Sequence, residues 1–210
     1  MEVPRARILI GTANAHKVAE LGALLEGLGC DLVVPGEIGL DEFDIDETGL
    51  TLMENAVLKA NAFARASGLP SLADDSGLEV DRLGGEPGVR SRRYAGEDAT
   101  DTDRIALVLS KLEAVADEDR GARFRCVIAF ATPDGLVGTG TGTVEGAIGR
   151  VPYGANGFGY DPIFLVRGTR PTMAELAPDA KNSISHRSRA IASVRPVVEA
   201  WLASGRSRDR

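Results

Sequence analysis

The chain has 210 residues, 43% of them hydrophobic and 26% charged, a balance typical of a globular protein, so that disorder is not the default expectation. The formal net charge of −7 argues against a nucleic acid polymer as partner, because proteins that follow a phosphate backbone carry a net basic face. No apolar run approaches the roughly 20 residues that span a bilayer, and the N-terminus lacks a secretory pattern. We therefore expect a cytoplasmic protein without a membrane partner.

The first third of the chain predicts alternating strands and helices. An apolar strand at 7–11 is followed by a helix that reaches Leu28, with Gly29 as its C-cap, and by a second strand at 31–34. Thr51 and Glu54 then form a capping box that opens a helix to about residue 66, closed by Gly68. This order predicts an α/β protein.

The rest of the chain continues this pattern with a hairpin in the middle. A helix follows Thr100, and two strands at 124–132 and 136–148 flank a Pro-Asp-Gly turn. A second capping box at 172–175 opens a short helix. The final helix starts after Ser185 and reaches about residue 203, with a proline as its weak point. We expect one domain over 1–204 and a disordered tail over 205–210.

The segment 12–17 lies between a strand end and a helix start, where α/β proteins bind ligands. Free N–H groups of the helix N-terminus, hydrogen bonds from Thr12 and Asn14, and the charge of Lys17 suit a phosphate. The alternative is that Asn14 only caps the helix while Lys17 is solvated, because the glycines of a P-loop are absent.

Two adjacent carboxylates, Asp74 and Asp75, follow the short apolar run 69–72, and Ser76 and Gly77 after them indicate a turn. Because like charges repel, such a pair is more stable beside a cation, and oxygen ligands suit Mg²⁺. One of the two could orient or deprotonate an attacking water. The alternative is an ordinary polar turn after a strand.

The acidic segment 41–47 and the helix that follows it supply a second group of charges. Most of these carboxylates are expected to be solvated, and Glu47, beside Gly49, is the candidate metal ligand. Lys59 falls well inside the helix. If it faces inward it needs a negative partner, and a phosphate or Asp75 would serve.

The segments 157–162 and 181–187 form the last candidate group. Glycines around Phe158 let an aromatic ring lie flat against a base, and donors from Lys181, His186 and Arg187 could read the edge of that base. His and Arg in a first helical turn oppose the helix dipole, which a bound nucleotide would offset. The alternative is a glycine-rich loop followed by a helix start whose basic residues serve solubility.

In this order the motifs resemble the inosine/xanthosine triphosphate pyrophosphatase family. The resemblance covers all but the arginine-rich tail and is carried by TANAHK at 12–17, ETGLTLMENAVLKA at 47–60, LADDSGLEV at 72–80, GGEPGVRSRRYAGEDAT at 84–100, FRCVIAF at 124–130, GFGYDPIF at 157–164 and AELAPDAKNSISHRSRA at 174–190. Ala13 departs from the glycine common in the family, and the stretch 91–94 is more basic than usual. Neither departure removes a catalytic side chain.

The resemblance implies an elongated, curved mixed β-sheet flanked by helices, with two lobes and a central nucleotide cleft. It implies a Mg²⁺-dependent homodimer that hydrolyses non-standard purine nucleoside triphosphates (ITP, dITP, XTP) to the monophosphate and pyrophosphate. Asp75 would be the proton acceptor, with Asp74 and Lys59 beside it, and Glu47 and Asp75 would hold the metal. The substrate-binding residues would be Thr12, Ala13, Asn14, Ala15, His16, Lys17, Ser76, Phe158, Gly159, Tyr160, Asp161, Lys181, His186 and Arg187.

Two other functions remain open at the level of sequence. One is a pyrophosphatase with another base preference, against which the base-side residues argue. The other is a nucleotide-binding sensor without chemistry, against which the retained Glu47, Lys59, Asp74 and Asp75 argue. How guanine is excluded, and how Asp74 and Asp75 divide their roles, is not visible in the sequence.

Overall fold

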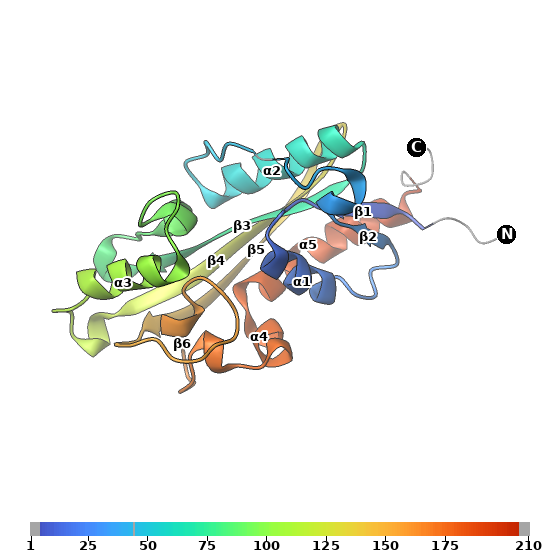
Figure 1. The fold of residues 1–210 in the computed structure, drawn as a ribbon. Coiled ribbons are helices and arrows are strands. Elements are labelled where there is room, and N and C mark those ends of the chain that lie inside the picture. The colour runs from blue at the N-terminus through green and yellow to red at the C-terminus, as the bar shows by residue number, and fades with distance from the viewer. Residues whose placement is uncertain (1–4, 44, 206–210) are drawn as a thin grey trace. The chain divides into compact units, whose positions relative to one another are not determined.

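The computed structural model describes residues 5–43 and 45–205. The predicted tail therefore lies, apart from Gly205, outside the described residues. A six-stranded sheet has the order β2-β1-β3-β4-β5-β6 (Figure 1). Its strands are β1 (Arg7–Ile10), β2 (Asp31–Val33), β3 (Ser71–Val80), β4 (Gly121–Thr132), β5 (Gly135–Ile148) and β6 (Phe164–Val166). The helices are α1 (Ala15–Leu24), α2 (Leu52–Ser67), α3 (Asp101–Lys111), α4 (Pro178–Ile184) and α5 (His186–Ala203).

Strand directions make the sheet mixed. β1 pairs in parallel with both β2 and β3, and β5 pairs antiparallel with β6. The parallel pairs require crossovers, which α1 and α2 supply, whereas the two-residue connection between β4 and β5 makes a hairpin. The predicted α/β class with a mixed sheet is confirmed.

The chain folds into two compact units. Unit 1 comprises residues 1–75, 127–142 and 187–210, and unit 2 comprises residues 76–126 and 143–186. In unit 1, α2 covers one face of the sheet and α1 and α5 cover the other (Figure 1). One core cluster of this unit joins Leu9 and Val33 of the sheet to Phe63 of α2.

Unit 2 has its own apolar core. Leu78 and Val80 of β3 pack with Phe124 of β4, and Val108 of α3 and Leu112, the C-cap of that helix, join them; all five are buried. The alternate residues of these strands carry charges instead. Arg123, for example, contacts Asp81 and Glu145 with its guanidinium at 2.7 and 3.2 Å.

The capping signals give α2 its limits. The Thr51 hydroxyl accepts from the Glu54 N–H at 3.1 Å, and Gly68 adopts the left-handed conformation (φ 71°) that ends the helix. The prediction for this helix is confirmed to within one residue. The α1 helix instead ends at Leu24, four residues before the predicted limit, although Leu25 and Leu28 are buried as its pattern indicates.

Three features differ from the predictions. The turn expected at Ser76 and Gly77 is wrong, because both lie within the ten-residue strand β3. β6 and α4 were not expected, since β6 has only three residues and α4 only seven. The capping box at 172–175 is present, but the helix it opens is a single 3₁₀ turn.

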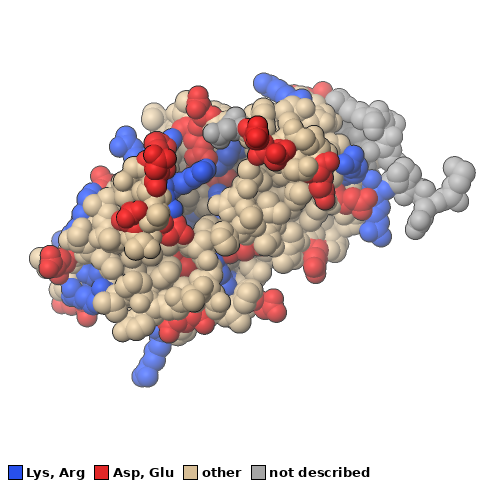
Figure 2. Space-filling view, in the orientation of Figure 1, with Lys and Arg blue, Asp and Glu red and all other residues tan. Residues whose placement is uncertain are grey.

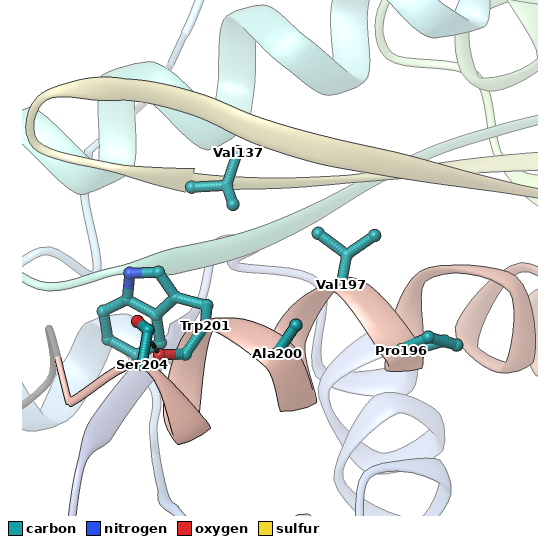
Figure 3. A pocket seen from close by; sticks show the side chains of 6 residues that line it. All are labelled: Val137, Pro196, Val197, Ala200, Trp201 and Ser204. Atoms are coloured by element: carbon teal, nitrogen blue, oxygen red, sulfur yellow. Dashed lines mark hydrogen bonds between the residues drawn. The ribbon is translucent and has the colours of Figure 1, made fainter.

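The surface of the described residues carries both signs of charge, and an apolar groove lies on it. On the face shown in Figure 2, Lys and Arg side chains are interspersed with Asp and Glu side chains over the described residues. The groove lies in unit 1 between β5 and α5 and contains no predicted site residue (Figure 3); it is lined by Val137, Pro196, Val197, Ala200, Trp201 and Ser204. Among the described helices, none is long and apolar enough to cross a membrane.

A buried arginine in unit 2 donates hydrogen bonds to backbone carbonyls at the ends of α3 and β5. Arg120 is 2% exposed, and its guanidinium donates to the carbonyls of Leu112, Ile148 and Gly149 at 2.6, 2.8 and 2.8 Å. Arg120→Met would leave these three acceptors without their donor. We expect it to lower the free energy of unfolding by about 3–5 kcal/mol.

Arg150→Met is the matched control for a urea unfolding experiment. Arg150 also binds carbonyls of this region, those of Glu113 and Val115, but its side chain is half exposed. We expect its replacement to cost less than about 1 kcal/mol. Equal losses in the two variants would show that burial of the Arg120 contacts is not what stabilises this part of the fold.

Candidate active site

The two neighbouring carboxylates of β3, Asp74 and Asp75, lie on opposite faces of the sheet and have different partners. Successive side chains of a strand point to opposite faces of the sheet, and Asp74 and Asp75 do so with both carboxylates buried. Asp74 meets α1 and α5 on one face, and Asp75 meets α2 on the other. The structure therefore does not make them one repelling pair at a turn.

Asp74 is the centre of a buried ion cluster. Its Oδ2 lies 3.0 Å from Lys17 Nζ and 3.3 Å from Arg187 Nη2, and Arg187 also pairs with Glu20. Burial alone would raise the pKa of Asp74, but Lys17 and Arg187 outweigh it and hold this pKa well below the usual range. Asp74 is thus a permanent anion that anchors two cations.

Asp75 shares a cation with Glu47. Lys59 Nζ lies 2.9 Å from Asp75 Oδ1 and 3.0 Å from Glu47 Oε1, so one ammonium bridges both carboxylates. Burial would lower the pKa of Lys59, but Asp75, Asp74 and Glu47 together raise it, so Lys59 is charged at neutral pH. The inward-facing Lys59 and its partner Asp75 match the expectation from the sequence.

The two aspartates also differ in proton affinity. Burial raises the pKa of Asp75 above that of an ordinary aspartate, and the nearby Lys59 opposes this only in part. The Asp74 carboxylate, with two cations, has its pKa moved in the opposite direction. Of the pair, Asp75 is the carboxylate suited to accept a proton during a reaction.

The carboxylates around Lys59 fit a divalent cation that is completed by other ligands. In residues 5–43 and 45–205, no group of three or more Asp, Glu, His or Cys side chains is arranged to hold a metal. Mg²⁺, however, is commonly bound through one or two carboxylates plus substrate phosphates and water. Glu47 and Asp75, already gathered around one cation, supply that smaller donor set.

The segment 12–17 begins α1. Asn14 is the N-cap and its Oδ1 accepts from the N–H groups of His16 and Lys17 at 3.0 and 3.3 Å. The capping role considered for Asn14 is therefore confirmed, whereas a solvated Lys17 is not, because its ammonium contacts Asp74. Thr12 accepts from the Asn14 N–H at 3.2 Å, and Ala13 and Ala15 are exposed between these residues.

Unit 2 holds the other predicted substrate residues. Lys181 and Asp161, both buried, form an ion pair at 2.6 Å, and Lys181 Nζ lies 4.9 Å from the centre of the Phe158 ring. Asp161 also accepts from the Phe158 N–H at 2.9 Å. A Cβ on Gly157 would lie 2.1 Å from Asp161 Oδ2, so the loop requires glycine there. Asp161 thus fixes both the loop and the lysine.

The remaining residues of this unit support that loop. The Tyr160 hydroxyl donates to the Ser91 carbonyl at 2.9 Å, and the Gly159 N–H donates to Asp101 at 2.7 Å. His186 is buried and stacks on Phe124 with a centroid distance of 4.8 Å. Ser76 follows Asp75 in β3 and is partly buried.

The structure places one predicted residue differently and adds two others. Arg187, expected beside His186 on the base side, directs its guanidinium to Asp74 and Glu20. No sequence signal pointed to Glu20 as a site residue, although it lies about one helical turn after Lys17. Asn55 was also missed as a site residue, although a polar side chain on the apolar face of α2 was a usable signal.

Known proteins are similar to this chain over most of its length. The model of the Ham1 family matches residues 8–197. A dITP/XTP pyrophosphatase of Methylococcus capsulatus is 49% identical over 190 residues, which cover 90% of this chain and 94% of that protein. A dITP/XTP pyrophosphatase of Bacillus subtilis is 48% identical over 192 residues, which cover 91% of this chain and 96% of that protein.

Solved structures agree with these matches. A HAM1 protein from Coxiella burnetii has a TM-score of 0.83 and 45% identity, covering 93% of this chain and 99% of that one. The Staphylococcus aureus Ham1 protein has a TM-score of 0.81 and 42% identity, with coverage of 93% and 99%. Sequence and structure together establish that this chain belongs to the Ham1 family.

Proposed function

We propose that this protein hydrolyses the non-standard purine nucleoside triphosphates dITP, XTP and ITP to the monophosphate and pyrophosphate. The observation that carries the proposal is that the Lys59 ammonium bridges the carboxylates of Glu47 and Asp75. These oxygens form a cation site, and one of the two carboxylates, Asp75, has a raised pKa. The names of the relatives, dITP/XTP pyrophosphatases at 47–49% identity, supply the substrate class.

The proposed chemistry assigns a task to four charged residues of unit 1. When bound, Mg²⁺ would neutralise phosphate oxygens and the charge that develops on leaving pyrophosphate. Glu47 and Asp75 would hold it, while Lys17 and Lys59 would offset further negative charge of the triphosphate. Water would attack the α-phosphorus and the α–β anhydride bond would break, with Asp75 taking the proton of the water.

Asp74 takes a supporting task in this proposal. Because it is paired with Lys17 and Arg187 and keeps its charge, it is suited to hold those cations rather than to accept a proton. These contacts support one division of the roles that the sequence left open. We propose that Asp75 performs the chemistry and that Asp74 positions Lys17.

Base selection is assigned to the predicted residues of unit 2. Lys181 and His186 are hydrogen-bond donors, and such donors suit the O6 acceptor of hypoxanthine and xanthine and oppose the 6-amino group of adenine. Phe158 offers an aromatic face for the base. The buried Lys181–Asp161 pair supports this assignment, because it keeps the lysine in place beside the Phe158 ring. A role of Arg187 in base binding stays a prediction.

We further propose that the metal is Mg²⁺ and that the protein is a cytoplasmic homodimer. The oxygen donors support the choice of metal. The dimer rests on the family resemblance alone, whereas the location is the expectation drawn above from the sequence. Light scattering after size exclusion would test the dimer, and a monomeric mass at micromolar concentration would contradict it.

A substrate panel tests the function directly. We expect pyrophosphate release from dITP, XTP and ITP with Mg²⁺, none with EDTA, and far slower release from GTP, ATP and dTTP. If GTP or a pyrimidine triphosphate led the panel, the base assignment would fail while the catalytic assignment survived. Tight nucleotide binding without any release would favour a sensor.

A further inference from the structure

A buried amide bridges the same two segments as Lys59. Asn55 is fully buried in α2, and its Oδ1 accepts from the Gly49 N–H at 2.8 Å. Its Nδ2 donates to Asp75 Oδ2 over a longer distance of 3.4 Å. One side chain thus connects the loop that follows Glu47 to the carboxylate of Asp75.

Side chains at the start of α2 accept hydrogen bonds from two consecutive backbone N–H groups of this loop. Glu54 accepts from the Leu50 N–H at 2.6 Å, next to the contact between Asn55 and the Gly49 N–H. A Cβ on Gly49 would lie 2.5 Å from Asn55 Oδ1 and 3.0 Å from the Asn55 backbone nitrogen. Helix and loop are therefore so close that residue 49 has no room for a side chain.

Asn55 and Lys59 differ in how they respond to a metal. They lie four residues apart, so they project from the same face of α2 toward Asp75. The Lys59 ammonium is itself a cation, so it and a divalent metal ion would compete for the oxygens of Glu47 and Asp75. The Asn55 amide is neutral, and its contact with Gly49 is made to the backbone, so both of its contacts are compatible with a bound cation.

We propose that Asn55 is a positioning residue that clamps the loop 47–50 against Asp75, so that Glu47 and Asp75 can hold one divalent cation together. This proposal rests on the proposed function, which identifies Glu47 and Asp75 as the metal ligands. Residues that orient metal ligands typically change metal affinity or activity 10–100-fold when they are replaced. A residue that only filled space in α2 would change stability without changing the metal concentration that the enzyme needs.

Asn55→Leu tests the clamp, because leucine has a similar size and makes neither hydrogen bond. The matched control is Asn61→Leu on the same helix, since the buried Oδ1 of Asn61 has no hydrogen-bond partner among the described residues. Two titrations are made for each variant: Mn²⁺ binding to the nucleotide-free protein by calorimetry, and the Mg²⁺ concentration that gives half-maximal pyrophosphate release from dITP. Thermal unfolding establishes that each variant is folded under assay conditions.

We expect Asn55→Leu to weaken Mn²⁺ binding and to raise the half-maximal Mg²⁺ concentration, each by roughly 10–100-fold. Asn61→Leu should stay within about twofold of wild type, the range expected where no metal ligand is oriented. Values for Asn55→Leu equal to those of the control would overturn the proposal. If Asn55→Leu did not fold, Asn55→Ser would replace it, and failure of both to fold would make Asn55 a structural residue and overturn the clamp.

The two readouts separate this proposal from the proposed function. Wild-type protein that binds Mn²⁺ but releases no pyrophosphate from any triphosphate would contradict the function and leave the Mn²⁺ comparison of the variants valid. Wild-type activity with unchanged metal requirement in both Asn55 variants would contradict the clamp alone.

Discussion

Asp75→Asn is expected to lower the rate of pyrophosphate release by about 10²–10⁴-fold, the usual contribution of a positioned proton acceptor. Asparagine has the shape of aspartate but cannot accept a proton from water at neutral pH. Lys59 keeps Glu47 as a partner at 3.0 Å, so the substitution does not strand a buried ammonium. We therefore expect the loss in kcat and only a small change in the free energy of unfolding.

The measurement is single-turnover pyrophosphate release from dITP at saturating Mg²⁺, with dITP binding measured separately. High metal compensates for the weaker ligand that asparagine makes, so that the remaining defect reports the chemical step. Asp46→Asn is the matched control, because Asp46 is exposed one residue before Glu47. A variant at position 75 that kept more than about a tenth of the wild-type rate would place the proton acceptor elsewhere, since even modest acid–base catalysis is worth more.

Local signals in the sequence predicted most of the elements that frame this site. Thr51, Glu54 and Gly68 act through neighbours in the chain, so the limits of α2 could be predicted closely. The strand β1 and the start of α1 at Asn14 followed in the same way from local pattern and capping.

The surroundings of Asp74 and Asp75 could not be predicted by the same means. Two adjacent aspartates favour a turn unless cations from elsewhere in the fold stabilise them, and here those cations are distant in sequence. Arg187 is 113 residues from Asp74, and Lys59 is 16 residues from Asp75. These ion pairs exist only in the folded chain, so the local sequence could not indicate them and predicted a turn. In the structure, the tertiary contacts stabilise Asp74 and Asp75 within the strand β3.

The position of Arg187 has the same cause. The pattern Ser-His-Arg at a helix start showed two basic side chains in one turn, but not which face each would take. Burial of Arg187 at 1% exposure depends on Asp74 and Glu20, carboxylates of β3 and α1. Asn55, in contrast, was visible as a polar residue on an apolar face, and only its partners were unknown.

Asp74→Asn is expected to lower the free energy of unfolding and to change kcat little, whereas Asp75→Asn is expected to lower kcat and to change stability little. The two positions are adjacent and the substitution is the same. Loss of the charge leaves Lys17 without this carboxylate, and it removes the pair between Asp74 and the buried Arg187 while the pair of Arg187 with Glu20 stays. Removing one member of a buried ion cluster costs about 3–5 kcal/mol, so the free energy of unfolding in urea should fall by that amount.

The catalytic defect of Asp74→Asn should appear mainly in KM. Lys17 loses the anchor that holds its ammonium at 3.0 Å, so its contribution to triphosphate binding weakens while Asp75 and Lys59 keep their contacts. We expect KM for dITP to rise by about tenfold, the effect of about 1.4 kcal/mol of binding free energy, with kcat changed less. Steady-state kinetics measures KM and kcat, under conditions in which the variant is folded. A kcat loss as large as that of Asp75→Asn, with stability unchanged, would reverse the roles of the two aspartates, because it would show that the deeply paired carboxylate performs the chemistry.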